Sequence, residues 1–206
     1  CGNMHRAEDL QGNTLFSAFT VLQNYMNDPV DVLNLQDPAA HPLFNHQGIN
    51  SHHLAATLSA KVPGSEQRHY LFTIGGDNTP YLNTIDRSLT ANGSQGEVLD
   101  PKNTSLRPSD EPTMKFARCM AVVDDRTGTA HSILYLKRFQ SGRTDLIGVD
   151  LHTLTQTTLN VDQAANPLDS WTAKDRVDQG EMQVSPDGRY LALTSRVQAP
   201  TQANQQ

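Results

Sequence analysis

The sequence predicts an all-β protein built from four-stranded antiparallel units. Two observations carry this prediction. Four strand-like runs separated by short polar breaks lie within residues 118–160, and residues 185–196 (SPDGRYLALTSR) join a tight turn to an alternating strand. Alternation of apolar and polar residues is typical of strands, while Gly, Pro, Asn, Asp and Ser are typical of the turns between them.

The first fifty residues differ from the rest and predict an N-terminal arm with a short helix. Asn13 or Thr14 is a suitable N-cap, and Asp28-Pro29 is a suitable end. Between them apolar residues recur at helical spacing: Leu15, Phe16, Phe19, Leu22 and Met26. We expect the arm, residues 1–50, to pack on the first β-unit rather than on a partner, although both remain open.

Residues 51–110 predict a first, loosely marked β-unit. Its strands are expected at 54–62, 69–74 and 81–86, with a turn at 75–78. Residues 91–110 are rich in Gly, Asn and Asp, so the fourth strand of the unit is not assigned. In this alignment Asp86 occupies the place that Asp150 has in the next unit.

Residues 118–160 predict a second, better marked unit. Its four runs are 119–124, 131–139, 145–151 and 155–159. Cys119 lies in the first run and is expected to be a small buried apolar residue.

Residues 185–197 predict the start of a third unit. In the turn, Pro186 presets its own φ, Asp187 can accept a backbone hydrogen bond from ahead, and Gly188 tolerates a positive φ. The strand that follows alternates between two faces. Beyond it, residues 198–206 are a polar tail or a truncated loop.

Residues 185–196 resemble the β-propeller repeat of the TolB-like periplasmic proteins, which also occurs in the propeller domains of prolyl-oligopeptidase-type peptidases. Residues 145–159 resemble the third and fourth strands of such a blade. The resemblance implies a β-propeller whose blades span residues 51–197, two of them followed by the start of a third. An unrelated β-sandwich is the alternative.

A closed propeller needs about four to eight blades, so this blade number implies an incomplete ring. One interpretation is that the chain is the N-terminal part of a longer protein. The other is a small protein that closes its open edge with another copy or another subunit.

Composition limits the range of partners. The chain has 206 residues, 36% hydrophobic residues and a formal net charge of −6. No basic segment suggests nucleic-acid binding, and no apolar run approaches the roughly 18 residues of a membrane span. Loops rich in Asn, Gln, Thr and Ser are common in exported bacterial proteins.

The chain begins with Cys1-Gly2-Asn3, as a mature bacterial lipoprotein would. An acylated Cys1 would attach the protein to a membrane by burying hydrocarbon chains, and Gly2 favours the outer membrane. The alternative is a fragment that begins with Cys by chance. We therefore expect a protein that is periplasmic or anchored in the outer membrane.

Four histidines lie close together in one polar segment: His41, His46, His52 and His53. Neutral imidazoles bind zinc, copper or haem iron. Their spacing matches no zinc motif, however, and the chain has no Cys-x-x-Cys-His haem attachment. We therefore expect no cofactor and solvated loop histidines, with a metal or haem site as the less favoured alternative.

Trp171 is the only tryptophan and lies between two predicted units. It is either an exposed interface anchor or, as we favour, a plug over the core. The chain contains no Gly-x-Ser-x-Gly elbow and no phosphate-binding loop. We therefore assign no catalytic residue.

These features favour a non-enzymatic binding or scaffolding module of the bacterial cell envelope, with a protein, peptide or glycan as its partner. The binding surface expected from the sequence comprises the four histidines and Trp171. The alternative is the N-terminal propeller part of a larger enzyme, either a serine peptidase or a haem- or metal-dependent oxidoreductase.

Overall fold

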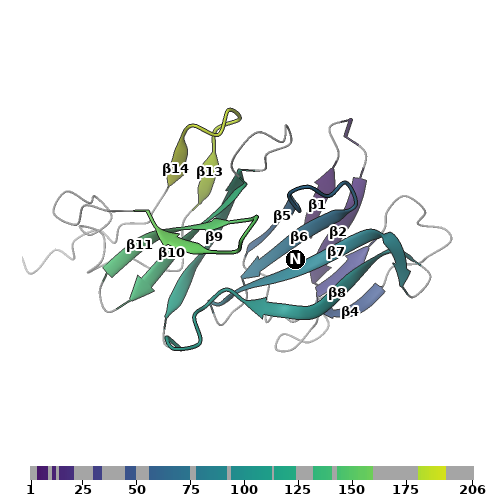
Figure 1. The fold of residues 1–206 in the computed structure, drawn as a ribbon, viewed down its shortest axis with the longest axis horizontal. Coiled ribbons are helices and arrows are strands. Elements are labelled where there is room, and N and C mark those ends of the chain that lie inside the picture. The colour runs from purple at the N-terminus through teal and green to yellow at the C-terminus, as the bar shows by residue number, and fades with distance from the viewer. Residues whose placement is uncertain are drawn as a thin grey trace, which may run out of the picture.

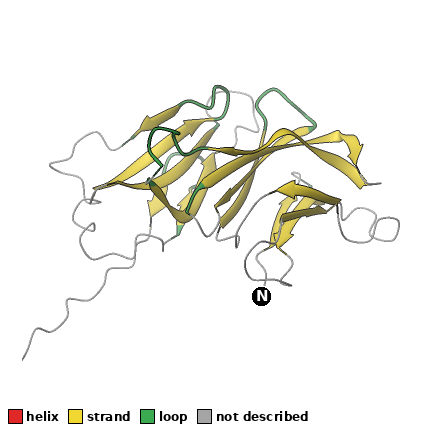
Figure 2. Ribbon diagram, turned by 90° about the horizontal axis from the view of Figure 1, so that it is seen from below, coloured by secondary structure: helices red, strands yellow, loops and turns green. Residues whose placement is uncertain are grey.

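A computed structural model describes most of the chain, and every regular element in that part is a β-strand (Figures 1 and 2). The described residues are 4–8, 11–12, 14–20, 30–33, 45–49, 56–74, 78–91, 94–112, 114–123, 132–140, 143–159 and 181–193. The all-β prediction is confirmed for these residues. Accordingly, none of them belongs to a helix long and apolar enough to cross a membrane.

The described strands form three four-stranded sheets and one two-stranded hairpin, all antiparallel and all ordered as in the chain. The first sheet contains β1 (Met4–Glu8), β2 (Thr14–Thr20), β3 (Val30–Leu33) and β4 (Asn45–Ile49). The second contains β5 (Ala56–Lys61), β6 (Arg68–Ile74), β7 (Pro80–Ala91) and β8 (Ser94–Ser105). The third contains β9 (Lys115–Val123), β10 (Ile133–Gln140), β11 (Arg143–Asp150) and β12 (Gln156–Thr158). The hairpin contains β13 (Met182–Val184) and β14 (Leu191–Leu193).

The predicted N-terminal helix is wrong, because Thr14–Thr20 is the strand β2. This strand pairs with β1 on one side and β3 on the other. Its sequence, TLFSAFT, is rich in Thr and Phe, which favour strands, and its apolar spacing over seven residues fits either periodicity. A helix of this length is only marginally stable by itself, whereas pairing with β1 and β3 stabilises the extended conformation. The first fifty residues therefore contain a sheet of their own.

The strands expected in the second and third sheets are confirmed. The runs 54–62, 69–74 and 81–86 contain or overlap β5, β6 and β7, and the four runs of 118–160 correspond to β9 to β12. The strand that the sequence left unassigned is β8, whose pairing with β7 is interrupted by register shifts. Gly96 and Asn103 in β8 both have positive φ, 107° and 55°. These departures from regular strand geometry explain why no strand pattern is visible there.

The third sheet is buried on both faces. Leu134 and Leu136 of β10 belong to a core shared with the second sheet, whereas Tyr135 between them packs against the hairpin β13–β14. In β9 the alternation is the same, with Met120 on the first side and Cys119 on the second. Cys119 is buried, as expected. The period of two thus divides the side chains of this sheet between two interfaces.

The core between the second and third sheets consists of apolar side chains, most of them large. Its members are Ala60, Phe72, Ile74, Leu82, Leu106, Met114, Phe116, Met120, Leu134, Leu136, Ile147, Val149 and Leu151. On the other face of the second sheet, Leu71 and Ile85 are also buried. On that side of the molecule β1 contacts β5 and β4 contacts β8.

The first strands of successive units lie close to one another: β5 contacts β9, and β9 contacts β13 (Figure 1). The turn before β14 is as the sequence predicts. Gly188 has φ 70°, and Asp187 Oδ1 accepts a hydrogen bond from the Arg189 N–H at 3.2 Å. A Cβ at Gly188 would lie 3.3 Å from Val123 Cγ1, so this turn lies against the end of β9.

Candidate functional site

Most of the binding residues expected from the sequence lie outside the described residues. These are Cys1, His41, His52, His53 and Trp171. His46 is in β4, but its side chain is not described. The structure therefore does not test whether these side chains come together. Within the described ranges, no group of three or more His, Cys, Asp or Glu is placed to hold a metal ion.

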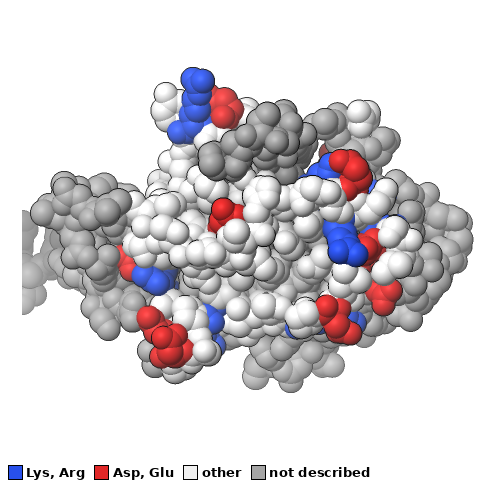
Figure 3. All heavy atoms as spheres, in the orientation of Figure 1, with Lys and Arg blue, Asp and Glu red and all other residues white. Residues whose placement is uncertain are grey.

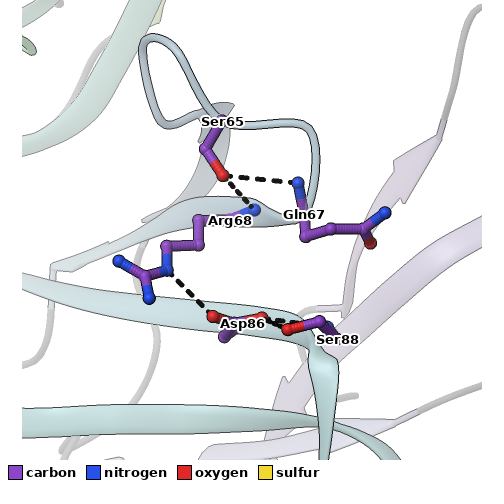
Figure 4. A network of polar contacts seen from close by, with 5 residues as sticks. All are labelled: Ser65, Gln67, Arg68, Asp86 and Ser88. Carbon is purple, nitrogen blue, oxygen red and sulfur yellow. Dashed lines mark hydrogen bonds and ion pairs between the residues drawn. The ribbon is translucent and has the colours of Figure 1, made fainter.

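A polar network lies at the start of β6 and joins it to the turn before it and to β7 (Figure 4). The β5–β6 turn is held by Ser65, whose Oγ accepts hydrogen bonds from the N–H groups of Gln67 and Arg68 at 3.3 and 3.0 Å. Gly64 in the same turn has φ 75°, a value that glycine adopts without strain. The turn thereby fixes the backbone position at which Arg68 begins the strand.

Arg68 and Asp86 are direct cross-strand partners on β6 and β7. Arg68 Nε donates to Asp86 Oδ2 at 2.8 Å. Asp86 Oδ1 accepts from the N–H of Ser88 at 2.9 Å and from its hydroxyl at 2.5 Å. The hydroxyl of Ser88 and then the guanidinium of Arg68 hold the pKa of the Asp86 carboxyl below its ordinary value. Asp86 is therefore a buried, ionised group with both oxygens occupied.

The third sheet contains a comparable pair, Arg138 and Asp145. They are direct partners on β10 and β11, and Arg138 Nη2 donates to Asp145 Oδ2 at 2.8 Å. Here the arginine is enclosed: its side chain is 17% exposed, against 53% for Arg68. Its Nη2 also lies 3.4 Å from the hydroxyl of Thr158 on β12. The two pairs share their chemistry but differ in access to solvent.

His69 follows Arg68 but lies on the opposite face of the second sheet, as the alternation of β6 requires. It is a direct partner of Lys61 and of Ile85 in the ladder. Burial, then the nearby charges of Arg87 and Lys61, lower the pKa of His69 to about 4. The imidazole is therefore neutral at physiological pH.

This depressed pKa predicts a loss of stability in mild acid. The folded state binds the His69 proton with a pKa of about 4, whereas the unfolded chain does so near 6.5. The unfolded state thus holds more protons between these values, and the free energy of unfolding falls as pH drops from about 6.5 to about 4, by at most about 3 kcal/mol. Urea unfolding at a series of pH values measures this slope.

The control for this experiment is the exposed His152. His69→Asn should flatten the slope between pH 6.5 and 4, while His152→Asn should leave it unchanged. Equal slopes in all three proteins would show that His69 is not held neutral by the fold.

Charged side chains lie near the turns that join the first two strands of the second sheet and of the hairpin (Figure 3). Glu66, 85% exposed, pairs with Lys61 at 2.7 Å in the β5–β6 turn. In the hairpin turn, Arg189 lies 3.9 Å from Asp187, and Tyr190 is 73% exposed. The backbone of Tyr190 is fixed, because its N–H donates to Ser185 Oγ at 2.9 Å and its carbonyl accepts from the Ser185 N–H at 2.8 Å. These turns present polar groups on a rigid scaffold.

Sequence reasoning missed the Arg68–Asp86 pair, although the information was present. An antiparallel register that pairs Ile74 with Pro80 also pairs Arg68 with Asp86. The predicted turn at 75–78 is compatible with that register. The expected equivalence of Asp86 and Asp150 is visible in their hydrogen bonds, since each accepts the N–H two residues ahead, from Ser88 and His152 respectively.

Comparison of the chain with protein-family models, with curated proteins and with solved structures found no match. The resemblance of residues 185–196 to TolB-like repeats therefore stays a prediction.

Proposed function

We propose that this chain is a non-enzymatic binding or scaffolding module built from TolB-like β-propeller blades. The observation that supports the proposal is the order of its units. The second and third sheets pack face to face, and the first strands of successive units contact one another, β5 with β9 and β9 with β13. Sheets that pack face to face with adjacent first strands are the arrangement that propeller blades have around a central axis. Each of the three four-stranded sheets, including the one in the first fifty residues, would then be a blade. The hairpin β13–β14 would be the first half of another blade.

The place of action that we propose is the bacterial cell envelope. The loops rich in Asn, Gln, Thr and Ser suit an exported protein, and the acylation of Cys1 expected in the sequence analysis would attach it to a membrane. The intact mass of the protein isolated from its native membrane tests this part. A mass that includes a glyceryl group and acyl chains supports the anchor, and an unmodified cysteine contradicts it.

The binding surface that we propose includes the turns between the first two strands of each unit. Two of them, around Ser65 and around Asp187, are fixed by side-chain to backbone hydrogen bonds. Loops held rigidly by a β-scaffold are common binding sites, because little conformational freedom is lost when a partner binds.

Site-specific photo-crosslinking in intact cells tests the proposal. A crosslinkable residue placed at Glu66 or at the exposed Tyr190 should capture a protein, peptide or glycan of the envelope, whereas one placed at exposed Thr157 on β12 should not. The same partner captured at both turns would support a binding module. Capture at Thr157 alone, or recovery of the protein only from the cytoplasm, would contradict it.

A further inference from the structure

We propose that Arg68 is an anion-binding residue, which receives a carboxylate or a phosphate group of a partner through the outer end of its guanidinium. This inference rests on the proposed binding function and adds the chemistry of the group that is bound. It is drawn from how firmly the side chain is held and from how much of it remains accessible.

The position of Arg68 is fixed at three points. Its N–H donates to Ser65 Oγ, and its carbonyl accepts the N–H of Val62 at 2.9 Å. Its Nε donates to Asp86 Oδ2. Asp86 is itself held by Ser88, so neither partner of the ion pair is free to turn. A cation held in this way loses little side-chain entropy when an anion binds.

The outer end of the guanidinium is accessible. The Arg68 side chain is 53% exposed, and its Nη1 and Nη2 make no hydrogen bond or ion pair with the residues that the structure describes. In Figure 4 the dashed line from Arg68 to Asp86 starts at Nε, and no dashed line reaches either of the two outer nitrogens. In the enclosed pair of the third sheet, Nη2 is instead used by Asp145 and lies near Thr158. The second sheet thus contains the same kind of arginine–aspartate pair, but the outer end of its arginine is accessible to solvent.

The two terminal nitrogens of a guanidinium form a planar fork that matches the two oxygens of a carboxylate or phosphate. Asp86 occupies only Nε, so a bidentate contact through Nη1 and Nη2 remains available. The nearest acid of the adjacent turn, Glu66, pairs with Lys61, which reduces its repulsion of an incoming anion. The chain as a whole carries a net charge of −6, so binding depends on this local arrangement and weakens with salt.

The test is a titration of the full-length ¹⁵N-labelled protein with sodium acetate, and separately with inorganic phosphate, at constant ionic strength. The observed quantity is the chemical shift of the Arg68 Nε–H. We expect a saturable shift in the wild type. Arg68→Lys keeps the charge but loses the fork, so its affinity, followed by backbone amide shifts in the β5–β6 turn, should fall about tenfold. The matched control Arg189→Gln removes another exposed arginine and should leave the affinity unchanged within about twofold.

Removing Arg68 alone leaves Asp86 buried without its cation, which can impair folding. The double variant Arg68→Gln/Asp86→Asn avoids this, and it should fold and show no saturable response. Saturation by acetate alone identifies a carboxylate, and saturation by phosphate identifies a phosphate. Linear shifts in every protein, or retained binding in the double variant, would overturn the proposal. Either result leaves the crosslinking at Tyr190 unaffected, so the failure of this inference is distinguishable from failure of the proposed function.

Discussion

Replacing Asp145 by asparagine is expected to lower the free energy of unfolding by about 3–5 kcal/mol. Asp145 is 2% exposed, and its carboxylate is the acceptor for Arg138 Nη2 at 2.8 Å. Arg138 Nε is already buried without a hydrogen-bond partner in the described part of the chain. Loss of the carboxylate charge would therefore leave a largely buried guanidinium uncompensated. Urea denaturation of the variant and the wild type measures the difference.

The exposed pair of Lys61 and Glu66 supplies the control, since Glu66→Gln should cost no more than about 1 kcal/mol. A second variant separates the charge from the packing. Arg138→Met/Asp145→Leu replaces both charges with apolar groups, and it should recover most of the stability lost in Asp145→Asn. If Asp145→Asn were as mild as Glu66→Gln, the pair would not be buried in solution.

Phe72→Ala should also destabilise the protein by about 3–5 kcal/mol. Phe72 has no exposed surface and lies in the core between the second and third sheets, where Ala would leave a large cavity. Its ring also contacts that of Tyr70, with 5.8 Å between the ring centroids. Leu89, 41% exposed on β7, is the control, and Leu89→Ala should change stability by less than about 0.5 kcal/mol. A loss below about 1 kcal/mol for Phe72→Ala would mean that these two sheets do not pack face to face.

The third sheet and the hairpin turn were predictable because their local patterns agree with their tertiary environment. In β10, alternate residues face different neighbours, yet both faces accept apolar side chains. In the turn, Gly188 stands where the backbone requires a positive φ. In both places the local preferences of the residues and their tertiary contacts favour the same structure. A sequence predicts its structure well under this condition.

The first sheet was not predictable, because the segment that became β2 has an apolar spacing suited to a helix or a strand. The choice depends on pairing with β1 and β3, which lie outside the segment whose apolar spacing was considered. The candidate site was missed for a related reason. Arg68 and Asp86 are separated by a hairpin, and their contact follows only once the register of β6 and β7 is known.

The chain-order arrangement of strands has a consequence for how the protein is made. Every described strand pairs only with the strand before it or after it in the sequence. Few long loops must close before the first contacts form, so the entropy cost of each pairing is small. Each sheet can therefore assemble as its own segment leaves the ribosome. The next sheet then packs on the exposed apolar face of the sheet that was synthesised before it.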